Sequence, residues 1–281
     1  MGAYDTKEIE TWKRFRELTE RDDYRSWAFR GQRDATWPLS SSLSRRFADV
    51  QVHKDAWVSQ EERALRIFKR KAHLFLDHIP QEDDSFEWLA LMQHHGAPTR
   101  LLDLTWSPYV AAFFALEDAT SDAAVWALCG PKVCGADEIT LATGQRIRPK
   151  EMSPRRIGNY EKYFLPGTEP LVFIGEPEIM NKRLVAQSGT FAVPGQLGRS
   201  IEDILSDYPG TAVVKLLLRT HKLRREAMRD LYNMNLTNAT LFPDLGGLGK
   251  SIAYELEFHW AFDPVTMVST PGFPPPDWYV K

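Results

Sequence analysis

The sequence is poor in cysteine, with only Cys129 and Cys134 among its 281 residues. Two thiols cannot make the disulfide framework that small secreted domains use. Without further cysteines or matched histidines they also cannot complete a tetrahedral zinc site. No His-Glu-x-x-His spacing supplies the missing ligands. We therefore expect no metal and a reducing, cytoplasmic environment.

The sequence also lacks a large excess of charge of either sign and long apolar runs. The formal net charge is -3, so the basic excess typical of a dedicated nucleic-acid binder is absent. One local basic stretch, 63–73, remains, and a solvated helix face explains it as well as a binding surface does. No apolar run approaches the length of a membrane span. The N-terminus is charged from the start and lacks an apolar signal core, so we expect no membrane partner.

Repeats, low-complexity tracts and Gly/Ser-rich linkers are absent as well. Hydrophobic residues make up 43% and charged residues 26%, so the chain can bury a full core. These features predict a single domain over 1–281. Its expected parts are a mainly helical segment with one early strand at 6–80, a mixed α/β core at 81–262 and a proline-rich tail at 263–281.

The apolar periodicity alternates between helix and strand spacing. The expected helices cover 6–21, 40–47, 56–78, 86–95, 109–116, 177–186, 222–234 and 250–262. The expected strands cover 24–31, 101–105, 123–129, 171–175, 189–193 and 211–219. Their irregular spacing does not fit repeated βαβ units, so we expect an α+β fold with a mixed, split or twisted β-sheet and a helical N-terminal third.

The segment His94–Leu116 has the highest density of chemically capable side chains. His94 and His95 end a predicted helix, where the helix dipole favours them, and a role in catalysis or ligand binding is the alternative. Arg100 and Asp103 follow a proline turn. An ion pair between them that staples the loop is one interpretation, and an approach to a binding site is the other.

Three further positions can contact an anion. Arg30 and Gly31 end the early strand, where a guanidinium beside a glycine suits a planar diphosphate, although an exposed strand-end arginine is the simpler interpretation. Thr105 and Ser107 precede the apolar helix, whose first N–H groups attract anions, and capping alone also explains Ser107. Gln187 stands between a helix and a strand, so its amide can project from a sheet edge.

Several of these segments occur together in one family. The triplet Phe29-Arg30-Gly31 and the stretch from Gln93 to Thr105 resemble the FRG domain, whose central pattern is Q-H-x-G-x-P-T-R-L-L-D-W-T followed by an apolar helix. The matching positions are Gln93, His95, Gly96, Pro98, Thr99, Arg100, Leu101, Leu102, Asp103 and Thr105. Leu104 stands where that pattern has tryptophan, and Gly246 stands where an aspartate is common. The resemblance covers about residues 27–248.

The order of these segments is also similar to that of ADP-ribosyltransferases, which implies an ADP-ribosyltransferase-like core and NAD as the substrate. The late position is Gln187 rather than a glutamate, and an amide lacks the charge that stabilises an oxocarbenium-like transition state. The resemblance implies that Arg30 holds the diphosphate and that Arg30, Ser107 and Gln187 form the catalytic set. The implied cofactor contacts are Arg30, Gly31, Thr105, Ser107, Arg100 and His95.

Three functions therefore stay open. The first is an NAD-dependent ADP-ribosyltransferase-like enzyme or NAD glycohydrolase, acting on a protein or nucleic-acid acceptor as a bacterial toxin or anti-phage defence effector. The second is a non-catalytic module that binds a nucleotide or nucleic acid in a degenerate transferase pocket. The third is a hydrolase or nuclease that uses His95 and Asp103. The sequence does not define an oligomeric state.

Overall fold

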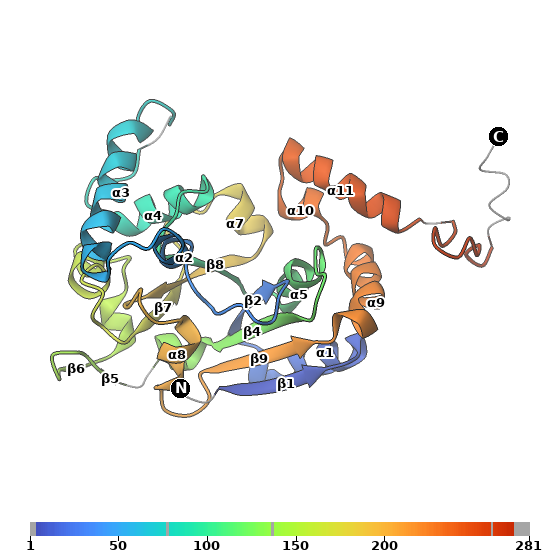
Figure 1. Cartoon of the computed structure of the whole chain (residues 1–281), viewed down its shortest axis with the longest axis horizontal. Coiled ribbons are helices and arrows are strands. Elements are labelled where there is room, and N and C mark those ends of the chain that lie inside the picture. The colour runs from blue at the N-terminus through green and yellow to red at the C-terminus, as the bar shows by residue number, and fades with distance from the viewer. Residues whose placement is uncertain (1–3, 77–78, 136–137, 260, 273–281) are drawn as a thin grey trace.

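The computed structural model describes residues 4–76, 79–135, 138–259 and 261–272. Its centre is a seven-stranded sheet in which β1 and β9 are parallel and the other neighbours are antiparallel (Figure 1). In spatial order the strands are β1 (Asp5–Ile9), β9 (Val213–Leu218), β4 (Ala123–Cys129), β2 (Trp27–Gln32), β3 (Leu102–Thr105), β8 (Gly189–Pro194) and β7 (Val172–Gly175). The fold is therefore α+β with a mixed sheet, as the sequence predicts.

Helices pack on both faces of this sheet. The helices of eight or more residues are α1 (Trp12–Thr19), α2 (Ser42–Asp49), α3 (Trp57–Ala72), α4 (Ser85–His94), α5 (Pro108–Leu116), α9 (Thr220–Asn233) and α11 (Leu245–Glu257). Shorter ones are α6 (Gly130–Cys134), α7 (Lys182–Ala186), α8 (Ile201–Ser206) and α10 (Asn238–Leu241). The single-turn segments are η1 (Asp22–Tyr24), η2 (Lys54–Ala56), η3 (Pro149–Met152) and η4 (Tyr160–Phe164), and β5 (Ile139–Thr140) pairs with β6 (Arg146–Ile147).

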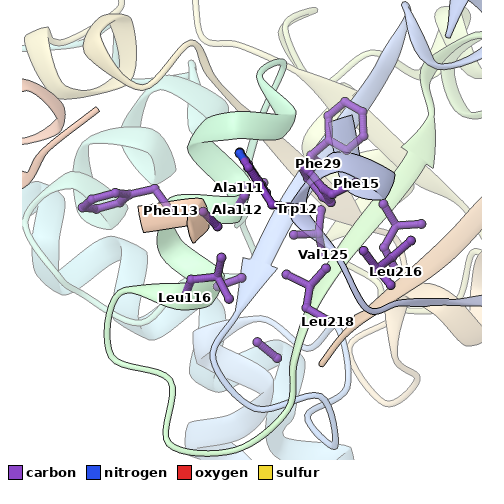
Figure 2. Packing of buried hydrophobic residues seen from close by; sticks show 14 of the residues in the cluster. Trp12, Phe15, Phe29, Ala111, Ala112, Phe113, Leu116, Val125, Leu216 and Leu218 are labelled. Carbon is purple, nitrogen blue, oxygen red and sulfur yellow. The ribbon is translucent and has the colours of Figure 1, made fainter. Parts of the chain in front are cut away.

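Strand β4, which lies between β9 and β2, is buried along its whole length. Alternate side chains of a strand point to opposite faces, so Val125 joins one core cluster and Trp126 another. The first cluster, shown in Figure 2, contains α1, α5 and α9 packed against β2, β4 and β9. The second lies between the opposite face and α8. Helix α5 is apolar on nearly every side, which fits its position in the first cluster.

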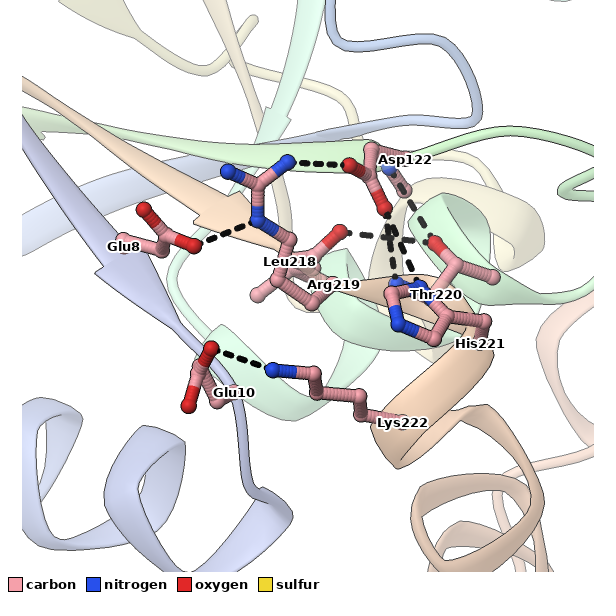
Figure 3. Close-up of polar contacts among 9 residues, drawn as sticks. Glu8, Glu10, Asp122, Leu218, Arg219, Thr220, His221 and Lys222 are labelled. Atoms are coloured by element: carbon pink, nitrogen blue, oxygen red, sulfur yellow. Dashed lines mark hydrogen bonds and ion pairs between the residues drawn. The ribbon is translucent and has the colours of Figure 1, made fainter.

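The predicted helix 6–21 is wrong in its first half, because Asp5–Ile9 form β1 and the helix begins at Trp12. Parallel pairing of β1 with β9 holds these residues, and polar contacts reinforce it (Figure 3). Arg219 forms ion pairs with Glu8 and Asp122 at 2.5 Å each. Ile9 continues the helical spacing of α1, so periodicity alone hides the strand.

The last helix, α11, lies five residues nearer the N-terminus than the predicted range 250–262. Helix α11 begins at Leu245, because the carboxylate of Asp244 accepts a hydrogen bond from the Gly247 N–H at 2.8 Å and caps it. Three early glycines conceal this start in the sequence. Residues 273–281 of the predicted proline-rich tail lie outside the described residues. Among the described helices, none combines the length and apolar character that crossing a bilayer requires.

Candidate functional site

The sheet splits between β2 and β3, and the split shapes the candidate site. These strands are paired only at Phe29 and Thr105, whereas β2 pairs with β4 over six residues and β3 with β8 over four. Beyond the single pair, the Nη1 atom of Arg30 donates a hydrogen bond to the carbonyl oxygen of Asp103 at 2.6 Å. A side chain thus satisfies a carbonyl that an unbroken sheet would pair with backbone.

A cavity of about 230 Å³ lies at this split. Its polar lining consists of Arg30, Asp103, Thr105, Arg183 and Gln187, and its remaining lining of Phe29, Gly31, Leu104 and Phe114. A smaller cavity of about 40 Å³ shares Asp103, Arg183 and Gln187 and adds Gln93, His94 and Asn181 to the polar lining. Because the two cavities share three lining residues, we treat them as one site, the split-sheet pocket.

Arg30 is the most unusual charge in this pocket. Its Nε atom is fully buried and has no hydrogen-bond partner, and no ion pair joins its guanidinium to a carboxylate in the described part of the chain. Burial lowers the pKa of Arg30, Asp103 opposes this effect, and Arg45 adds to it. A partly buried cation with an unused, buried N–H donor is costly, and an anion bound in the pocket would supply the missing partner.

A chain of hydrogen bonds holds Asp103 in place. The amide nitrogen of Gln93 donates to Asp103 Oδ2 at 2.8 Å, and the Thr99 hydroxyl donates to the amide oxygen of Gln93 at 2.7 Å. The Leu101 N–H in turn donates to the Thr99 hydroxyl at 3.1 Å. Gln93 and Thr99, which belong to the stretch from Gln93 to Thr105, therefore hold the Asp103 carboxylate in position at the split-sheet pocket.

Thr105 and Gln187 line the pocket and also form hydrogen bonds that connect β3, the end of α7 and α10. The Thr105 hydroxyl donates to the carbonyl oxygen of Gln187 at 2.7 Å, and the Gln187 amide donates to the carbonyl oxygen of Leu241 at 3.0 Å. Ser188 adopts a positive φ of 45°, which turns the chain sharply from α7 into β8. The Gln187 amide oxygen accepts no hydrogen bond from another described residue, so it stays available to a ligand.

Ser107 does not line the split-sheet pocket, so the structure does not bring the whole expected catalytic set of Arg30, Ser107 and Gln187 together. Its hydroxyl accepts a hydrogen bond from the Val110 N–H at 3.3 Å and caps α5, and it is not among the pocket-lining residues. Gly31 does line the pocket, but its small size serves packing. A Cβ there would lie 1.9 Å from the carbonyl oxygen of Ala111, so β2 approaches α5 this closely only with glycine.

Arg100 and His95, two of the expected cofactor contacts, do not line the split-sheet pocket. Arg100 is 0% exposed, and its guanidinium forms an ion pair with Glu61 rather than with Asp103. His95 lines a separate apolar groove of about 670 Å³ beside α3. The histidine near Asp103 is His94, and its pKa is lowered first by burial and then by His95 and Arg183.

The pocket offers anion-binding groups and one carboxylate, but no metal site. Groups of three or more histidine, cysteine or acidic side chains placed to hold a metal ion are absent from the described residues. Neither Arg183 nor the hydrogen bond from Gln93 to Asp103 was predicted from the sequence. A usable signal existed for Arg183, because it lies four residues before Gln187 and therefore on the same face of a helix.

In a comparison with known families, residues 25–124 fit the model of the FRG domain. The chain contains an FRG domain. No curated protein and no solved structure matched the chain. The FRG domain supplies Arg30, Asp103 and Thr105 to the split-sheet pocket, whereas Arg183 and Gln187 come from beyond the matched residues. The pocket therefore depends on both the FRG domain and the chain that follows it.

Proposed function

We propose that the split-sheet pocket binds the diphosphate-bearing part of NAD, and that the chain transfers ADP-ribose from NAD or hydrolyses NAD. The observation that carries this proposal is the partly buried Arg30 side chain, whose buried Nε has no hydrogen-bond partner and whose guanidinium forms no ion pair with a described residue. A guanidinium matches the planar, bidentate geometry of phosphate oxygens. Arg183 lines the same pocket and adds a second positive charge.

The pocket volume supports the binding of part of a dinucleotide. At about 230 Å³ it lies below the ~300–1,000 Å³ typical of sites that enclose a whole small molecule. The rest of the ligand would lie outside, past the guanidinium of Arg183, which is 4.7 Å from the ring centroid of Phe242.

The acceptor in this proposal is a protein or nucleic-acid group, or water in the case of hydrolysis. An enzyme that modifies host macromolecules or drains NAD would harm the cell that contains it. We therefore propose a role as a toxin or as an anti-phage defence effector. Expression under tight control, with growth and cellular NAD followed after induction, tests this role, and unchanged growth and NAD content would contradict it.

The direct test compares NAD binding by the full-length chain with that of Arg30→Gln. A hydrogen bond to a charged group contributes roughly 1.5–3 kcal/mol, so we expect a ten- to hundredfold weaker Kd for Arg30→Gln by calorimetry. Arg33→Gln is the matched control, because Arg33 is exposed and does not line the pocket. Equal affinities of wild type and Arg30→Gln would refute the assignment of Arg30.

A second candidate function is nucleotide binding without turnover. It is favoured because the Gln187 amide and the Thr105 hydroxyl already donate hydrogen bonds to backbone carbonyl oxygens. It is also favoured because Gln187 carries no charge that could stabilise a transition state. A thermal-shift series separates the two functions, because any ligand that binds only the folded state raises the Tm. A raised Tm with NAD but no released nicotinamide would favour the binding module.

A further inference from the structure

Asp103 is the one acidic side chain that lines the split-sheet pocket in the described part of the chain. It lies on β3 next to the split, and its carbonyl oxygen accepts the hydrogen bond from Arg30. Asp103 and Arg183 line both cavities, and Arg30 lines the larger one. This position differs from that of Gln187, which follows α7.

The two oxygens of this carboxylate have different surroundings. Oδ2 accepts the hydrogen bond from Gln93, whose amide the Thr99 hydroxyl orients, whereas Oδ1 has no hydrogen-bond partner among the described residues. One oxygen is thus anchored while the other stays free for a ligand. An anchored charge needs little reorganisation when positive charge develops beside it, and such preorganisation makes a catalytic group effective.

We propose that Asp103 is a catalytic residue of this chain, an inference that rests on the proposed cleavage of NAD. The bond between ribose C1′ and the nicotinamide nitrogen breaks, and both of its electrons leave with nicotinamide, which becomes neutral. Asp103 stabilises the positive charge that spreads over C1′ and the ring oxygen. Water or an acceptor hydroxyl then bonds to C1′ and gives its proton to Asp103, which releases it to solvent.

Gln93 is a positioning residue in this scheme, because it acts on the substrate through Asp103. Its amide nitrogen donates to the carboxylate and its amide oxygen accepts from Thr99. The proposal explains why a glutamine, a threonine and an aspartate occur together in the central signature. It also locates the negative charge that Gln187 cannot provide, on a different element of the sheet.

The test uses the full-length chain and measures NAD affinity and nicotinamide release separately. Asp103→Asn keeps the shape of the side chain and removes its charge, so we expect a Kd within about threefold of wild type. We expect nicotinamide release to fall by roughly a hundredfold or more, the loss seen when one transition-state stabiliser is removed. Asp49→Asn is the control, because Asp49 is exposed and does not line the pocket.

Gln93→Ala gives a second measurement in case Asp103→Asn folds poorly, which circular dichroism will show. We expect Gln93→Ala to lower kcat with little change in KM, because it loosens the carboxylate without removing it. Release by folded Asp103→Asn above a third of the wild-type rate would overturn the inference while leaving the proposed function intact. A wild-type chain that binds NAD without releasing nicotinamide overturns the catalytic role, and one that does not bind NAD overturns the proposed function itself.

Discussion

The buried ion pair between Arg100 and Glu61 should be the most sensitive polar contact in the fold. Arg100 Nε donates to Glu61 at 2.7 Å, and Nη1 donates to the carbonyl oxygens of Phe164 and Pro194, the latter at 3.1 Å. The Tyr160 hydroxyl also donates to Glu61 at 2.7 Å. Because Arg100 is 0% and Glu61 3% exposed, removing one partner leaves an uncompensated buried charge.

The perturbation is Arg100→Met, which keeps much of the side-chain volume and removes the cation. Breaking a buried pair from one side costs about 3–5 kcal/mol. At roughly 2 °C per kcal/mol for a chain of this size, the Tm should fall by about 6–10 °C. The double variant Arg100→Met/Glu61→Leu removes both charges and should recover part of that loss, because the Phe164 and Pro194 carbonyl oxygens and the Tyr160 hydroxyl still lose their partners.

The free energy of unfolding of the wild type, both single variants and the double variant, measured by calorimetry and urea titration, gives a double-mutant cycle for Arg100 and Glu61. A loss below about 1 kcal/mol for Arg100→Met would refute the buried-pair account, as would a double variant no more stable than the single ones. NAD binding measured on the folded fraction should be unchanged, because Arg100 does not line the split-sheet pocket. Weaker binding would instead support the cofactor contact expected from the sequence.

The remaining predictions concern the surroundings of the site. Gly31→Ala should destabilise the chain by about 1–3 kcal/mol in urea, because its Cβ would lie 1.9 Å from the Ala111 oxygen; an unchanged midpoint would contradict this packing. Ser107→Ala should lose about 1 kcal/mol through the α5 cap while its Kd for NAD stays unchanged, whereas a weaker Kd would restore Ser107 to the pocket. Burial lowers the pKa of His94, so the unfolded chain takes up a proton more readily and stability should fall as the pH drops below 6.5. His94→Gln should show a smaller loss between pH 7.5 and 5.5, and an equal loss would refute the role of His94.

The strongly apolar elements of the fold were predictable from the sequence. The strand at 123–129 and the helix at 109–116 are buried enough that their composition alone identifies them. Strand β1 was not predictable, because its residues are mostly exposed and only pairing with β9, more than two hundred residues away, makes it a strand. Such non-local pairing leaves no periodic signal in a charged segment.

The same limit applies to the candidate site. Arg30, Gly31, Thr105 and Gln187 were predicted together, and the structure brings them to one pocket. An ion pair between Arg100 and Asp103 was one interpretation of the sequence because the two residues are only three apart. However, Asp103 lies in β3 and Arg100 precedes that strand, and a spacing of three does not bring side chains together in extended backbone. The partner of Arg100 lies on α3, and sequence spacing does not reveal it.

The measurement that tests the account most directly is a crystal structure of the full-length chain with ADP-ribose, the product expected from NAD. The account predicts diphosphate oxygens within hydrogen-bond distance of the Arg30 guanidinium, and the ribose C1′ near the free oxygen of Asp103. ADP-ribose bound away from Arg30, for example in the apolar groove beside α3, would contradict the assignment of the split-sheet pocket.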